Sequence, residues 1–160
     1  MTVYPNPTAN PTETEARNLV TMRKMITAFN ENSRDIVAQC VDPNLISYSP
    51  HQPGTERQED EIAVQRAAFP DLYYSEEITI ADGDMVFLGW QSTGTHSGPM
   101  LGTAATGVRF ELHGGEVARF RNGLIIEHWD HWLKPRGQCY IILDALPAEE
   151  VSRLQAGGLL

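Results

Sequence analysis

Two turn-forming dipeptides in the second half of the chain constrain its fold more than any other feature. Asp82-Gly83 separates β-rich runs at residues 73–80 and 85–95, and Asn122-Gly123 separates similar runs at residues 108–120 and 124–132. Such dipeptides tolerate positive φ at the two central positions of a tight β-hairpin. The sequence therefore predicts two antiparallel hairpins in this half of the chain.

The first half has helical periodicity instead. Thr12 and Glu15 have the spacing of a capping box, and the apolar residues that follow recur at helical intervals: Leu19, Met22, Met25, Ile26 and Phe29. Ser33 is expected to cap a second, shorter helix that ends by Asp42, because Pro43 disfavours helical geometry in the residue before it. A short strand at residues 45–49 and a third helix at residues 58–68 complete the prediction.

Helices followed by antiparallel strands indicate an α+β fold, with three helices packed on one curved antiparallel sheet. The chain has 160 residues, which is close to the usual size of one domain. Residues 1–10 contain two prolines and almost no large apolar side chains, so we expect them to form a flexible arm. Residues 11–160 are then expected to form a single domain.

The charge balance excludes some classes of partner. Twelve Lys and Arg against 21 Asp and Glu give a net charge of −9, which would repel nucleic acid and anionic membrane surfaces. No apolar run is long enough to cross a bilayer, and the polar start lacks the pattern of a secretory signal, so a cytoplasmic location is expected. Cys40 and Cys139 are too few for a disulfide framework or a thiolate zinc site.

The segment Glu127-His128-Trp129-Asp130-His131-Trp132 is the best candidate for chemistry. Side chains alternate between the two faces of a strand, so His128, Asp130 and Trp132 are expected on one face. On the preceding predicted strand, Glu116 is the only charge in an apolar alternation. A carboxylate in such a stripe needs a partner or a function, so Asp130, His128 and Glu116 are the candidate catalytic residues.

Whether Glu116 shares a face with Asp130 depends on the register of the hairpin. With Asn122-Gly123 as its central pair and no bulge, Glu116 is opposite Trp129. The Gly114-Gly115 pair suggests a bulge nearby, and one extra residue would reverse the facing relation. A surface position or an ion pair with Arg119 is the structural alternative for Glu116.

A metal centre is a rival interpretation of the same segment. His128-x-Asp130 on one strand face resembles part of the facial triad of non-haem iron enzymes. Such enzymes usually take a further histidine from downstream, and none follows His131. We therefore predict no metal ligands and no cofactor.

Aromatic residues at strand positions could line a ligand cavity, although such residues are more often part of an ordinary core. The candidate substrate-binding residues are Trp90, Tyr48, Phe110, His96 and Trp132, and further aromatic candidates for the cavity wall are Tyr73, Tyr74 and Phe87.

Several short motifs, taken in order, resemble the SnoaL-like polyketide cyclase family. They are Phe69-Pro70-Asp71-Leu72, Asp82-Gly83-Asp84, residues 94–98 (GTHSG), 101–103 (LGT), Thr106-Gly107, Asn122-Gly123 and residues 127–130 (EHWD). The resemblance implies the cone-shaped α+β fold of the nuclear transport factor 2-like, or cystatin-like, proteins. That fold agrees with the order of elements inferred above.

The resemblance also implies an activity. Family cyclases close a ring by intramolecular aldol condensation on an anthracycline-type polyketide ester during antibiotic biosynthesis, without cofactor or metal. In that family a carboxylate acts as the base, and its role would fall to Asp130. Glu116 stands where the cyclases carry an active-site histidine, and His128 could supply the missing hydrogen-bond donor.

Other functions occur on this fold, because fold does not determine function. An epoxide hydrolase would use two acids and an arginine, for which Glu116, Asp130 and Arg119 are the candidates. A polyketide hydroxylase and a non-catalytic ligand-binding protein are further alternatives. The convex face of the sheet commonly mediates dimers in this fold, so we expect a homodimer that takes a small hydrophobic substrate.

Overall fold

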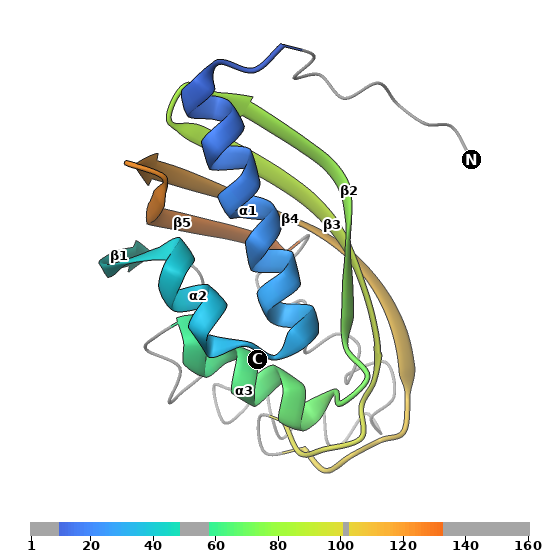
Figure 1. Cartoon of the computed structure of the whole chain (residues 1–160). Helices are drawn as coiled ribbons and strands as arrows, with labels where there is room; N and C mark the ends of the chain where they lie inside the picture. The colour runs from blue at the N-terminus through green and yellow to red at the C-terminus, as the bar shows by residue number, and fades with distance from the viewer. Residues whose placement is uncertain (1–9, 49–57, 101–102, 133–160) are drawn as a thin grey trace.

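The computed structural model describes residues 10–48, 58–100 and 103–132 of the chain. In chain order the elements are α1 (Glu13–Glu31), α2 (Arg34–Cys40), β1 (Val41–Ser47), α3 (Gln58–Ala68), β2 (Tyr73–Asp82), β3 (Met85–Thr95), β4 (Arg109–Arg121) and β5 (Leu124–Trp132). The expected α+β order of helices and sheet is confirmed (Figure 1). The proposed arm and the domain limit at residue 160 lie outside the described residues and stay predictions.

Local signals define the ends of the first two helices. The Thr12 side chain accepts a hydrogen bond from the backbone N–H of Glu15, whose carboxylate in turn accepts from the Thr12 N–H, so α1 begins with a complete capping box. It ends at Asn32, which adopts a left-handed conformation with φ 54°. The Ser33 side chain caps α2 by accepting from the Ile36 N–H.

The sheet has five strands in the order β1-β5-β4-β3-β2. Neighbouring strands from β2 to β5 pair antiparallel, but β1 pairs parallel with β5, with Ser47 opposite His128. The sheet is therefore mixed, which corrects the expectation of an antiparallel sheet. Because β1 and β5 are not joined by a hairpin turn, the direction of β1 relative to β5 depends on the path of the chain between them. Pro43 is tolerated because β1 is an edge strand.

The two hairpin turns differ in detail. Asn122 and Gly123 both have positive φ, 55° and 82°, as the primed turn of an Asn-Gly hairpin requires. In the β2–β3 hairpin Asp82 pairs with Met85, so the turn residues are Gly83 and Asp84, one position later than expected. Of these two only Gly83 has positive φ, at 61°.

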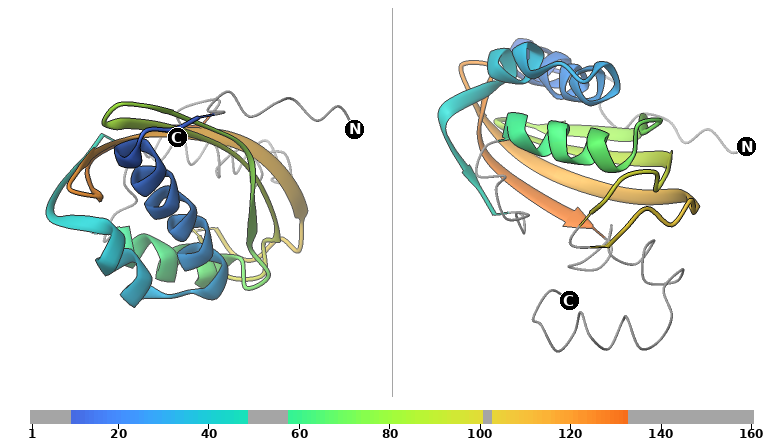
Figure 2. Two further views of the ribbon diagram at one scale, coloured as in Figure 1. Left: turned by 45° about the horizontal axis from the view of Figure 1, so that its top comes forward. Right: turned by 90° about the horizontal axis from the view of Figure 1, so that it is seen from below.

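All three helices lie on the concave side of the curved sheet, as Figures 1 and 2 show. The residues of one continuous hydrophobic core come from the helices and from the inner side of the strands, and include Met22, Met25, Val37, Ile62, Phe69, Val86, Leu88, Trp90, Phe110 and Phe120. Cys40 is part of this core, and its burial raises the pKa of the thiol. The core leaves space near its centre, between α1, α3 and the sheet, which is described below.

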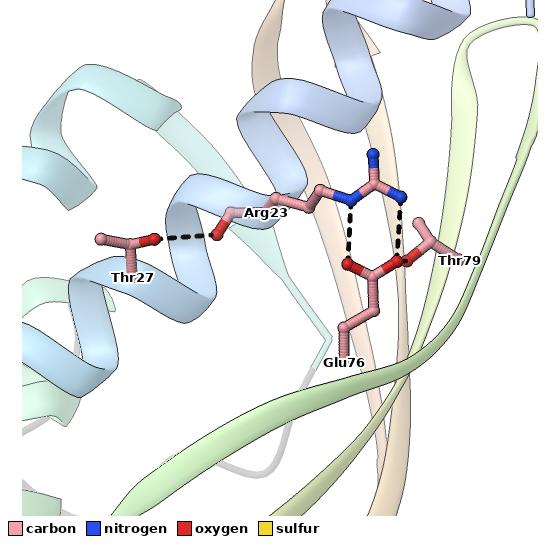
Figure 3. A network of polar contacts seen from close by, with 4 residues as sticks. All are labelled: Arg23, Thr27, Glu76 and Thr79. Atoms are coloured by element: carbon pink, nitrogen blue, oxygen red, sulfur yellow. Dashed lines mark hydrogen bonds and ion pairs between the residues drawn. The ribbon is translucent and has the colours of Figure 1, made fainter.

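Two arginines hold the helices in place around that space. The Arg23 guanidinium makes two hydrogen bonds, of 2.8 and 2.9 Å, to the Glu76 carboxylate, which also accepts from the Thr79 hydroxyl (Figure 3). This contact joins α1 to β2. Arg66 of α3 donates to the backbone carbonyls of Phe29 in α1 and of Leu72, the residue just before β2, and so joins α3 to both segments.

Within the described part of the chain, no helix combines the length and the apolar character needed to cross a membrane.

Candidate functional site

A hollow lies between the helices and the concave face of the sheet. It measures about 450 Å³ when its open mouth is included, and about 40 Å³ of it is interior space that the centre of a water molecule can reach. The lining residues are Met25, Ile26 and Phe29 of α1, Glu61 and Gln65 of α3, Tyr74 of β2, Leu88 and Trp90 of β3, Glu116 of β4 and His128 of β5. An apolar wall with a few convergent polar groups is typical of a small-molecule site.

The register of β4 and β5 decides which polar groups face this hollow. Glu116 pairs with Asp130 and Ala118 with His128, whereas Phe120 pairs with Ile125. Ile126 is therefore an extra residue, and this bulge reverses the facing relation of an unbulged hairpin. The structure thus has the bulged register, in which Glu116 lies opposite Asp130 and not Trp129.

The Gly114-Gly115 pair is not the site of this bulge, because it pairs regularly with Trp90 and Gly89. A side chain at position 114 would place its Cβ 2.4 Å from the Trp90 ring, and one at position 115 would place it 2.8 Å from the Phe87 ring. The two glycines thus make room for one aromatic ring on each face of the sheet. A bulge does occur in this hairpin, as the sequence suggested, but it lies at Ile126 and not beside the two glycines.

Glu116 and His128 form a hydrogen-bonded pair in the wall of the hollow. Glu116 Oε2 lies 2.8 Å from His128 Nε2, and the two side chains are 19% and 7% exposed. When the carboxylate is ionised it can only accept, so the shared proton then lies on His128 Nε2. The pair also lines a smaller adjoining hollow formed with Met22, Met25, Val41, Leu45 and Ile125.

A second polar group, on the helical side of the hollow, was missed by sequence reasoning. The Tyr74 hydroxyl donates to Gln65 Oε1 at 3.0 Å, and Gln65 Nε2 donates to Glu61 Oε1 at 3.0 Å. Glu61 and Gln65 are four residues apart, so they share one face of α3. That spacing was the available signal, but it did not show that this face lines a cavity.

The predicted substrate-binding residues are dispersed. Trp90 lines the hollow, as does Tyr74 from the wider aromatic set. Tyr48 does not: it is 56% exposed and stacks on Trp129, with ring centroids 5.1 Å apart. Phe110 is buried against Phe69, with ring centroids 5.0 Å apart, and is part of the core rather than of the cavity wall.

Three aromatic candidates remain. Tyr73 and Phe87 are exposed and occur at strand positions that face away from the helices. The side chain of Trp132, like that of Asp130, lies outside the described residues.

His96 is buried in the loop after β3 but is not part of the cavity wall. Its Nδ1 accepts a hydrogen bond from the Thr106 N–H at 3.2 Å and lies 2.9 Å from the Thr106 hydroxyl. Burial lowers the pKa of His96, and the Gly98 backbone offsets this only in part. The contacts of His96 are those of a structural residue that holds the loop together.

Arg119 lies on the other face of β4 from Glu116, since an odd number of positions separates them. It pairs with Asp84 at 3.0 Å and with Glu127 at 3.1 Å. The suggested ion pair between Glu116 and Arg119 is therefore wrong, and so is the arrangement of Glu116, Asp130 and Arg119 suggested for an epoxide hydrolase.

Among the side chains that the structure describes, which exclude those of residues 130–132, no group of three or more His, Cys, Asp or Glu is placed to hold a metal ion.

Comparison with known proteins identifies the family. A family profile for SnoaL-like polyketide cyclases matches residues 19–133, which is more than half of the chain. The chain belongs to the SnoaL-like polyketide cyclase family. This match includes every element that lines the hollow, and it confirms the resemblance inferred from the sequence. No match was found among curated proteins.

Solved structures agree with this assignment. AclR from Streptomyces galilaeus, described as a candidate hydroxylase, is 27% identical, with a TM-score of 0.69 over 83% of this chain and 99% of its own. IdmH from Streptomyces antibioticus, a candidate polyketide cyclase, is 27% identical, with a TM-score of 0.61 over 71% and 90%. A candidate SnoaL-like polyketide cyclase from Jannaschia sp. CCS1, 21% identical with a TM-score of 0.73 over 87% and 97%, shares the fold.

Proposed function

We propose that the protein is a cofactor-independent polyketide cyclase that closes a ring by an intramolecular aldol reaction. The observation that carries this proposal is the Glu116–His128 hydrogen bond of 2.8 Å in the wall of a largely apolar hollow. Family membership and the similarity to IdmH support the same reaction class.

The reaction needs one base and one proton donor. The base breaks an acidic C–H bond next to a carbonyl, and the electron pair forms an enolate. The enolate carbon then attacks a second carbonyl carbon of the same molecule, so that a C–C bond forms and the new alkoxide takes up a proton. No atom is gained or lost, and the chain's own side chains can supply both functions.

Asp130 is the proposed base. Its Cα pairs directly with that of Glu116 on the neighbouring strand, and residues opposite one another in an antiparallel pair have Cβ atoms only ~5 Å apart. In this register position 130 lies on the strand next to Glu116, whose carboxylate bonds to His128. Apolar surroundings keep water away from the reacting carbon.

Glu116 and His128 together are the proposed proton donor. In related cyclases a histidine is expected at position 116, and here the glutamate instead bonds to the imidazole of His128 on the next strand. A proton held between them can be donated to the carbonyl oxygen where enolate charge develops. This arrangement would restore a donor in spite of the glutamate.

The test is turnover of an aromatic polyketide methyl ester that carries an acidic carbon between two carbonyls. Asp130→Asn should lower kcat about a hundredfold or more, the usual contribution of a general base. Exchange of the acidic hydrogen for deuterium in D₂O reports the first step alone and should fall in parallel.

Glu111→Gln is the matched control, because this exposed glutamate is on the same strand as Glu116 but on its outward face. Its activity should equal that of the wild type. If Asp130→Asn cyclises and exchanges the substrate as fast as the wild type, the proposed base is wrong. If the wild type binds the ester but does neither, the ligand-binding alternative replaces the cyclase.

We also propose that the protein is a homodimer. Tyr73, Ile80 and Phe87 are 58%, 37% and 36% exposed, and Ile80 pairs with Phe87 on the outward face of β2 and β3. Apolar side chains grouped in this way favour contact with another protein surface. A monomer mass by light scattering at micromolar concentration would contradict the dimer.

A further inference from the structure

The polar groups on the helical side of the hollow form a chain of hydrogen bonds with one direction. The Tyr74 hydroxyl donates to Gln65, and Gln65 donates to Glu61. Because the Gln65 amide accepts at its oxygen and donates at its nitrogen, both bonds determine how it is oriented. Glu61 carries a carboxylate, which accepts hydrogen bonds and cannot donate one when ionised.

This chain is rigidly held. Gln65 is only 2% exposed. The Tyr74 ring packs edge-on against Phe29 and Trp90, with centroid distances of 5.5 and 5.2 Å. The buried Gln65 amide therefore keeps its acceptor, Glu61 Oε1, at a defined position. Glu61 is thus supported as an acceptor in the cavity wall.

The hollow therefore has acidic groups from two different sides. Glu61 and Gln65 come from α3, whereas Glu116 and His128 come from β4 and β5. Among the described lining residues, His128 is the single side chain able to carry a positive charge. An anionic group entering this hollow would meet two carboxylates, whereas a hydroxyl or an ammonium group could donate to them.

We propose that Glu61, held by Gln65 and Tyr74, is a substrate-binding residue that selects ligands with a hydroxyl or amine group. This group would occupy the helical side while the reacting carbon faces Glu116 and His128. The inference deepens the proposed function and rests on it for the position of the reacting carbon. A hydroxyl or amine group on the ligand should then raise its affinity, and a carboxylate in the same place should lower it.

Binding of one-ring probes tests this inference without requiring turnover. We would titrate phenol, anisole and benzoate into ¹⁵N-labelled protein and read both the Kd and the location from amide shifts. Phenol should bind about tenfold more tightly than anisole, because a hydrogen bond to a charged group contributes more than one between neutral groups. Its shifts should centre on α3 and β2, and benzoate should bind more weakly than either.

Glu61→Met should reduce the preference for phenol over anisole to about twofold or less, and Glu61→Gln should give an intermediate ratio. Thermal unfolding of each variant confirms that it is folded. Glu111→Gln on the outward face is the matched control and should keep the wild-type ratio. An unchanged ratio in folded Glu61→Met overturns the inference, as does a ratio lost in Glu116→Gln alone.

The test of Glu61 as a binding residue and the test of Asp130 as the catalytic base can fail independently. Loss of the phenol preference in Glu61→Met, together with full cyclisation by Asp130→Asn, would support the binding role of Glu61 and contradict the catalytic base. The reverse pair of results would contradict only the role of Glu61. In turnover, Glu61→Met should raise KM for a hydroxylated ester and leave kcat nearly unchanged.

Discussion

The two faces of the sheet each carry a histidine–glutamate pair, and the two pairs have nearly the same geometry. On the concave face His128 Nε2 lies 2.8 Å from Glu116, and on the convex face His113 Nδ1 lies 2.9 Å from Glu77. The side chains of the first pair are 7% and 19% exposed, whereas those of the second are 49% and 43% exposed.

The difference lies in the surroundings, not in the contact. Around His113, water and a second glutamate, Glu111, screen the interaction. The hollow that His128 lines is otherwise walled by Trp90, Leu88 and apolar side chains of α1. The same hydrogen bond is therefore a surface feature in one place and a candidate source of chemistry in the other, because low polarity strengthens electrostatic effects.

The largest expected effect separates the two pairs by activity. Glu116→Gln should lower kcat/KM for the polyketide ester about a hundredfold, because the pair loses its charge and the carboxylate that accepts the His128 proton. Glu77→Gln should change it less than twofold. Both are measured by product formation under identical conditions, and equal losses in the two variants would mean that the concave pair has no special role.

A smaller effect separates the two faces by packing. Gly114→Ala would push against the Trp90 ring, which is 4% exposed and enclosed by the core, and should destabilise the fold by about 2–3 kcal/mol. Gly115→Ala would meet the Phe87 ring, which is 36% exposed and can move outward. Its cost should be about 1 kcal/mol or less.

Urea denaturation of both variants measures this difference. If Gly115→Ala is as costly as Gly114→Ala, the outward face is more tightly packed than its exposure indicates. Contact with a second copy would be one cause, so comparing low and high protein concentration would sharpen the result.

The smallest effects concern pH, and they have opposite signs in a buried and an exposed histidine. Burial lowers the pKa of His96 below 6.5, so the unfolded chain binds more protons and the wild type loses stability as pH falls below 6.5. The hydrogen bond to Glu77 raises the pKa of His113 above 6.5. Its contribution is present below 6.5 and is lost as pH rises through the folded-state pKa.

The free energy of unfolding between pH 5 and pH 8 checks both signs. As pH falls below 6.5, the free energy of unfolding of His96→Gln should decrease less than that of the wild type. That of His113→Gln should decline less than that of the wild type as pH rises above 6.5, and this difference should be small because the pair is exposed. If both variants change the pH dependence of the free energy of unfolding in the same direction, the assignment of His96 to a buried site and of His113 to an exposed ion pair is wrong.

Much of the fold could be predicted because its signals are local. The capping box at Thr12 and Glu15, the cap at Ser33 and the turn at Asn122-Gly123 act through hydrogen bonds and φ preferences within a few residues. The third helix matches its predicted range at residues 58–68, and β3 and β5 match theirs. These features depend little on the rest of the chain.

The candidate site could be predicted only in part. Glu116 and His128 were found as a lone charge in an apolar stripe and as part of a polar aromatic segment, and the structure brings them together. Tyr48, Phe110 and His96 were selected by residue type, and each instead has a partner elsewhere. Residue type alone does not distinguish a cavity wall from a packed core.

The helices, the hairpins and the family could be predicted from the amino-acid sequence, because short-range geometry and ordered motifs encode them. The parallel pairing of β1 with β5, the bulge at Ile126 and the contact of Glu61 with Gln65 in the cavity wall became visible only in the folded chain. These outcomes depend on packing between segments that are far apart in the chain. A one-residue shift of register costs little locally, yet it turns every following side chain to the other face.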